Sequence, residues 1–110
     1  MEFYNDRGKR IGKLELRNGE LWLVKRVKRD KHMLRQPYGA WATDAEHIPL
    51  LRKAGAAGIV LIVDGGKQVL YSRLERWEDK SFPVRRWGNQ VALMGSEWRE
   101  RDEAQGVLPL

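Results

Sequence analysis

The sequence predicts a small α+β domain with a mostly antiparallel sheet, an N-terminal Asn-Gly β-hairpin and one main helix. Three observations support this class: an Asn-Gly pair between two alternating apolar segments, a helical apolar pattern after it, and a continuous β-branched run that ends in a glycine turn. Residues 1–110 are expected to form a single domain, with residues 106–110 as a flexible tail.

The first predicted element is a hairpin that turns at Asn18-Gly19. Both central residues of a type I′ turn need a positive φ, and Asn-Gly adopts that conformation readily. This register pairs Leu14 with Leu23 and Leu16 with Leu21, so we expect the four leucines to be buried together on one face. The opposite face is expected to be basic and to carry Lys13, Glu15, Arg17, Trp22, Arg26 and Lys28.

A long loop and a helix are expected next. Residues 29–42 show no clean period and contain Pro37 and Gly39, which predicts a loop. Thr43 and Glu46 have the spacing of a capping box, which predicts a helix that begins after Thr43 and stops at Gly55. Pro49 conflicts with a helix interior because it has no amide donor, so the alternatives are a start nearer His47 or a kink in the helix there.

The remaining elements are expected to be mostly strands. Residues 58–64 form a β-branched run typical of a strand buried on both faces. Residues 64–67 predict a turn, and residues 68–72 the antiparallel partner strand. Residues 73–83 are expected to be a linker or a short helix, and residues 84–94 one or two strands broken at Gly88-Asn89.

The positive charge is concentrated at the N-terminal end. The chain has 21 Lys and Arg against 15 Asp and Glu, and its formal net charge of +6 lies entirely within residues 1–40. An excess of this kind is typical of nucleic-acid-binding proteins. Aromatic residues are interleaved with these charges, as on surfaces that combine phosphate contacts with base stacking. The predicted nucleic-acid-binding residues are Arg17, Trp22, Lys25, Arg26, Lys28, Arg29, Lys31, Arg35, Tyr38 and Trp41.

Two alternatives to this interface stay open. The basic residues could form an ordinary solvated face that binds nothing. Trp22 could be covered by the C-terminal segment, whose Trp87 and Trp98 also need burial.

Several functional classes lack the residues that they need. The chain has no cysteine, and its two histidines, His32 and His47, fall in different predicted elements. We therefore expect no disulfide, no metal site and no cofactor. The serines have no nucleophile-elbow context, and the glycines form no phosphate-binding loop.

The longest apolar run, residues 59–63, is far too short for a membrane helix, and the N-terminus has no apolar signal core. These features predict a cytoplasmic protein without a membrane partner. The many charges and few amide side chains are typical of thermophiles.

Residues 46–55, 58–63 and 69–71 resemble the later half of the core of the PD-(D/E)XK nucleases, which include the Holliday-junction resolvases. The resemblance covers about a third of the chain, and Lys25 occupies the lysine position of the family's acid-x-Lys triplet. It implies hydrolysis of DNA with a metal ion held by carboxylates. The acid position, however, is Leu23, and Glu15 points to the opposite face from Lys25. Glu20 and Asp30 could replace the acid only in another register, so the resemblance implies an inactive or altered member.

The function predicted from these observations is that of a small, non-catalytic nucleic-acid-binding accessory protein that uses residues 13–41. Two alternatives from other classes stay open. One is a divergent metal-dependent nuclease of the type just described. The other is a protein-interaction or phage-type assembly component that binds its partner through the Trp-rich segments.

Overall fold

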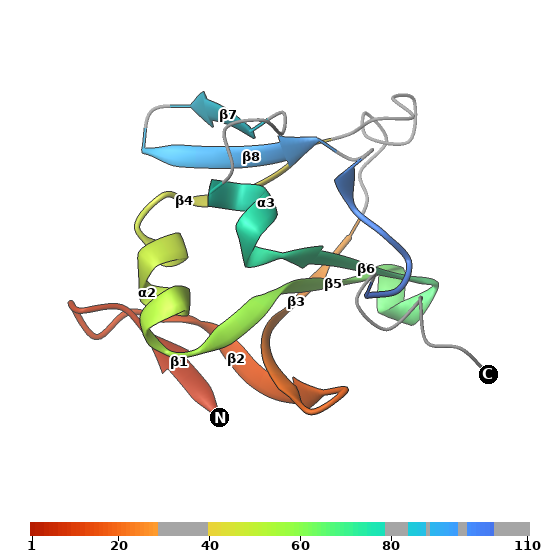
Figure 1. Cartoon of the computed structure of the whole chain (residues 1–110), viewed down its shortest axis with the longest axis horizontal. Helices are drawn as coiled ribbons and strands as arrows, with labels where there is room; N and C mark the ends of the chain where they lie inside the picture. Colours follow the sequence, from red (N-terminus) through yellow and green to blue (C-terminus); the bar gives the residue numbers. More distant parts are fainter. Residues whose placement is uncertain (29–39, 79–83, 88, 95–96, 103–110) are drawn as a thin grey trace.

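The computed structural model describes residues 1–28, 40–78, 84–87, 89–94 and 97–102. These residues form two β-sheets, with α2 and α3 packed between them (Figure 1). The larger sheet has the order β1 (Glu2–Tyr4), β2 (Arg10–Arg17), β3 (Glu20–Val27), β5 (Ala56–Val63) and β6 (Gln68–Arg73). The smaller sheet has the order β4 (Ala40–Asp44), β8 (Gln90–Met94) and β7 (Val84–Trp87). The helices are α2 (His47–Lys53), α3 (Leu74–Glu78) and the 3-10 turn η1 (Asp64–Gly66).

The predicted α+β class with a largely antiparallel sheet is confirmed. Among the described strands, every neighbouring pair is antiparallel except β3 with β5, which run parallel. The parallel pair requires a crossover, and the connection from β3 to β5 passes through β4 and α2. This crossover places the smaller sheet over one face of the larger one.

β2 and β3 pair across a turn at Asn18 and Gly19, whose φ values are 55° and 79°. The register joins Leu14 to Leu23 and Leu16 to Leu21. Leu14 and Leu23 are buried in the main core, whereas Leu21 is only half-buried and Leu16 is 73% exposed. The predicted burial of Leu16 is therefore wrong. The reason is that the hairpin tip extends beyond the part of the sheet that the helices cover (Figure 1).

The main core lies between the two sheets, and a second, smaller cluster lies on the outer face of the larger sheet. β5 contributes to both, because Ile59 and Leu61 point into the main core and Val60 and Ile62 into the second cluster. The predicted strand with two buried faces is confirmed, and β6 is its antiparallel partner. Strands β7 and β8 flank the predicted break at residues 88–89.

The predicted capping box is wrong, and the alternative start near His47 is confirmed. Thr43 belongs to β4, where it pairs with Val91 of β8, and α2 begins at His47 with Glu46 as N-cap. Pro49 is then in the first turn, where the missing amide donor costs nothing. Gly55 follows the helix with a φ of 77°, a conformation that ends helices.

Part of the predicted loop is also a strand, since β4 begins at Ala40. Pairing with β8 orders residues 40–42, which have no strand pattern of their own. Residues 29–39 of the predicted loop and residues 106–110 of the predicted tail lie outside the described residues.

Candidate nucleic-acid interface

A basic groove of about 450 Å³ lies where β2 and β3 diverge. Pairing between the two strands ends at Lys13 and Val24. Beyond this point β2 pairs with β1, and β3 pairs with β5, so the two strands separate. Among the described residues, the groove lining contains four cationic side chains and a single carboxylate, Glu15; the cations are Arg10, Lys13, Lys25 and Arg26.

The cations of this region differ in how strongly they are already paired. Lys13, Arg26 and Lys28 are exposed, and the structure places no described carboxylate within ion-pair distance of Arg26 or Lys28. Lys13 lies 3.9 Å from Glu15. Arg10 forms an ion pair with Glu2. Arg26 and Lys28 are therefore the predicted binding residues that are most available to a phosphate.

Arg17 is held by the protein itself. Its Nη1 donates a hydrogen bond of 3.1 Å to the Tyr71 hydroxyl, and its guanidinium lies 3.9 Å from Glu15. A contact with phosphate would have to replace these partners, so Arg17 is a weaker candidate than Arg26.

Trp22 is not available for base stacking, which corrects the sequence prediction. The side chain has 0% exposed surface and packs edge-to-face with Tyr71, their ring centroids 5.3 Å apart. Arg73 lies over its ring and is held by Asp102 of the C-terminal segment, at 2.6 Å. The residues that cover Trp22 thus belong to β6, and the C-terminal segment contributes through Asp102, which holds Arg73. Trp98 of that segment packs against Trp77 in the main core instead.

Lys25 and Trp41 point toward the main core. Lys25 alternates with Leu23 and Val27 on the inner face of β3, and its Nζ donates a hydrogen bond of 3.2 Å to Thr43 Oγ1. Trp41 is half-buried and packs against the main core. Lys25 points to the opposite face of β3 from Arg26, and although it lines the groove, its ammonium is engaged with Thr43. The other predicted binding residues, Arg29, Lys31, Arg35 and Tyr38, lie outside the described residues.

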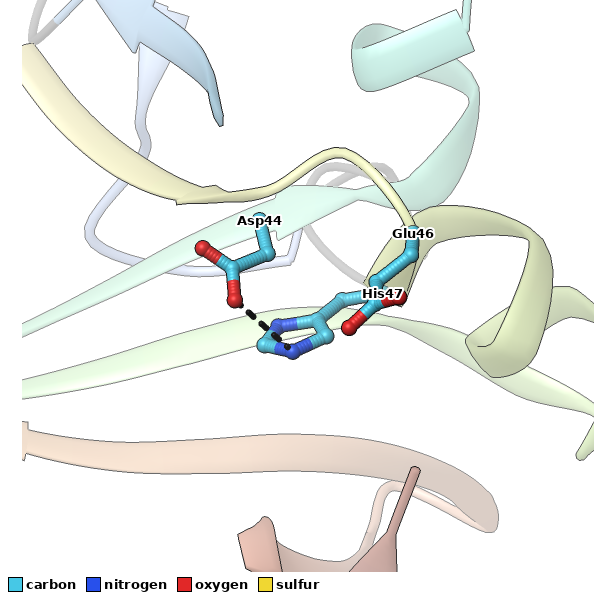
Figure 2. Close-up of side chains that lie close together, drawn as sticks. All are labelled: Asp44, Glu46 and His47. Atoms are coloured by element: carbon cyan, nitrogen blue, oxygen red, sulfur yellow. Dashed lines mark ion pairs between the residues drawn. The ribbon is translucent and has the colours of Figure 1, made fainter. Parts of the chain in front are cut away.

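Lys25 is one end of a chain of polar contacts inside the fold. Thr43 Oγ1 lies 2.9 Å from His47 Nδ1. His47 Nε2 lies 3.6 Å from Asp44 Oδ2, the ion pair drawn in Figure 2. Burial lowers the pKa of Lys25. Burial, and then the Lys25 ammonium, lower the pKa of His47. A neutral His47 fits the contacts, because Nδ1 can accept the Thr43 hydroxyl proton while Lys25 donates to the Thr43 oxygen.

Asp44, Glu46 and His47 are the described residues that could hold a metal ion. One ligand atom from each lies within 4.8 Å of the others, and imidazole with carboxylate is a common ligand set for zinc and related ions. Two features oppose binding. Arg7 donates to both oxygens of Glu46, at 3.3 and 2.7 Å, and the Lys25 ammonium lies one hydroxyl away from His47. A metal could recruit Glu46 only by displacing Arg7.

This cluster is not among the sites predicted from the sequence, because that prediction rests on the two histidines only as a pair. The signal that could have found it is the closeness of Asp44, Glu46 and His47 along the chain. The link from His47 to Lys25 has no such signal, since 22 positions of sequence separate them and the fold brings them together.

Comparison with protein-family models, with curated proteins and with solved structures found no match for this chain. In the described part of the chain, neither helix has the length and apolar character needed to cross a membrane. The geometry and charge of the sites described above are therefore the basis for assigning a function.

Proposed function

We propose that this chain is a non-catalytic nucleic-acid-binding protein that contacts phosphates through the β2–β3 surface. The observation that supports the proposal best is the basic groove, in which Lys13 and Arg26 are exposed cations and Glu15 is the one carboxylate among the described lining residues. A concave surface of one charge sign concentrates the electric field and attracts a polyanion. Contacts with the phosphate backbone are enough for binding that tolerates any sequence.

The residues that we assign to this contact are Lys13, Arg26 and Lys28. Lys13 and Arg26 are exposed on neighbouring strands, and Lys28 directly follows β3. Lys13 has only the 3.9 Å contact with Glu15, and no described carboxylate forms an ion pair with Arg26 or Lys28. Arg29, Lys31 and Arg35 continue the basic segment in the sequence and belong to the same proposal. Aromatic stacking contributes less than the sequence predicted, because Trp22 is buried and Trp41 is half-buried.

A salt titration of binding tests the proposal. Affinity for fluorescently labelled single-stranded and duplex DNA is measured by anisotropy at increasing salt. If about four cations each neutralise a phosphate, log K should fall against log salt with a slope of about −4 on B-DNA. Arg26→Ala and Lys28→Ala should each reduce the steepness by about one and weaken all sequences alike.

Lys53→Ala is the matched control. Lys53 is an exposed lysine at the end of α2, near the opposite end of the β3–β5 pair. Its removal subtracts the same charge but should leave both affinity and slope nearly unchanged. If no DNA or RNA binds at low salt, the basic surface is only solvated, and the interaction-protein alternative becomes the better proposal.

The second candidate is the divergent metal-dependent nuclease implied by the PD-(D/E)XK resemblance. It is favoured by one observation, the contact chain from Lys25 through Thr43 to His47 and Asp44. Leu23 still occupies the acid position, and Arg7 binds the Glu46 carboxylate. We therefore expect no Mg²⁺- or Mn²⁺-dependent cleavage of duplex, single-stranded or four-way-junction DNA. Cleavage that disappears in His47→Ala or Asp44→Asn would replace the non-catalytic proposal with this one.

A further inference from the structure

We infer that the basic groove takes the phosphomonoester at the end of a nucleic-acid strand, in preference to a phosphodiester within it. This inference rests on the proposed function and names the part of the nucleic acid that the groove recognises.

The first argument is the shape of the groove. Backbone pairing joins β2 to β3 from Lys13 and Val24 toward the hairpin turn, so the gap between the strands ends there, with Glu15 of the paired part in the lining. The groove then widens as β2 follows β1 and β3 follows β5. A strand end needs one entrance, whereas the middle of a strand would need a second path by which the chain leaves. A groove closed at one end therefore favours a terminus.

The second argument is charge. A phosphomonoester carries about −1.5 to −2 at neutral pH and has three acceptor oxygens, whereas a diester carries a single negative charge. Lys13 and Arg26 line the groove as exposed cations, and Glu15, 3.9 Å from Lys13, is the only carboxylate among the described residues of its lining. An arginine fork can bind two phosphate oxygens at once. More than one cation in a single groove therefore matches the more highly charged group.

The third argument is the size and character of the remaining lining. Ile11, Val24 and Val27 add apolar surface beside the cations. The volume of about 450 Å³ falls in the range of pockets that hold a small organic ligand. The groove can therefore hold a terminal phosphate with part of its nucleoside, whose carbon atoms would lie against these side chains.

The experiment compares two single-stranded DNA oligonucleotides of identical sequence, both labelled at the 3′ end. One has a 5′-phosphate and the other a 5′-hydroxyl. Because the phosphate also adds charge, a third oligonucleotide has a 5′-hydroxyl and one extra nucleotide. We expect the phosphorylated strand to bind at least about tenfold more tightly than either control.

Three variants separate the groove from the general basic surface. Arg26→Ala and Lys13→Ala should abolish the preference for the phosphorylated end. Lys28→Ala should weaken both strands equally and keep the preference, since Lys28 does not line the groove. Circular dichroism of each variant checks that the fold is retained.

The remaining outcomes contradict either this inference or the proposed function. Equal binding of phosphorylated and hydroxyl ends overturns this inference but leaves the proposed function in place. Absence of binding to all three oligonucleotides overturns the proposed function itself. Inorganic phosphate is the competitor that distinguishes a free anion from a strand end. If it displaces the phosphorylated strand at concentrations near the dissociation constant of that strand, the groove is a free-phosphate site and the inference is wrong.

Discussion

The guanidinium of Arg73 lies over the ring of Trp22, with its Cζ 5.5 Å from the ring centroid. Two carboxylates hold it there: Glu20 at 2.7 Å and Asp102 at 2.6 Å. A cation over an indole is stabilising, and more so where water is excluded. Arg73 thus connects β6, the start of β3 and the C-terminal segment, and it closes one side of the second core cluster.

Asp102→Ala should destabilise the protein by about 1.5–3 kcal/mol, the range for losing charge-assisted hydrogen bonds. The Asp102 side chain is fully buried, but Arg73 keeps Glu20 and some contact with water, which limits the loss. Urea unfolding followed by circular dichroism measures the effect, and Arg101→Ala, an exposed neighbour, is the control. A loss no larger than that of the control would mean that Asp102 does not fix Arg73.

Leu23→Ala and Leu16→Ala should differ strongly although both leucines are in the same hairpin. Leu23 has 0% exposure, so its truncation should cost about 2–5 kcal/mol. Leu16 is largely exposed, so its truncation should change the free energy of unfolding by less than about 0.5 kcal/mol. Chemical unfolding of the two variants measures both values. Similar losses would contradict the burial pattern described here.

Gly58→Ala should destabilise the sheet by about 3 kcal/mol or prevent folding. A β-carbon at this position would press against the Ser72 carbonyl oxygen and lie 2.8 Å from both Arg73 Cα and Trp22 Cζ3. Two of these three neighbours are backbone atoms of β6, so the steric clash could be removed only if β5 and β6 moved apart. Gly65→Ala is the control. Its β-carbon would meet open space, and the positive φ of 70° should cost only about 1–2 kcal/mol. Thermal unfolding compares the two, and a smaller loss for Gly58→Ala would show that the strands can move apart.

Protonation of His47 should make the metal-free protein less stable in weak acid. Burial lowers the folded-state pKa of His47 below its usual 6.5, so the unfolded chain binds the proton first as pH falls. The stabilisation is complete above about pH 6.5 and is lost as pH falls through the folded-state pKa. NMR titration of the two histidines measures this pKa directly. His47→Gln should reduce the pH dependence of unfolding, and a folded-state pKa at or above 6.5 would contradict the prediction.

Local signals in the sequence predicted the elements that depend on neighbouring residues. Asn18 and Gly19 tolerate a positive φ, and both adopt it in the turn between β2 and β3. Gly55 ends α2 for the same reason. The β-branched run of β5 favours an extended backbone wherever it is placed. In each case the backbone conformation is preferred by the residue itself and by its immediate neighbours in the sequence.

The sequence by itself therefore determined the strand-rich α+β class, the alternation of faces along β3 and the basic character of its N-terminal end. Only the tertiary structure decided which of those faces is covered. Trp22 is on the predicted face, but Tyr71 and Arg73 bury it, while Leu16 is on the predicted core face and is exposed. The tertiary structure also decided that β3 runs parallel to β5 and that Lys25 forms a hydrogen bond with Thr43. Alternation follows from the backbone of a single strand, whereas burial depends on distant segments that pack over it.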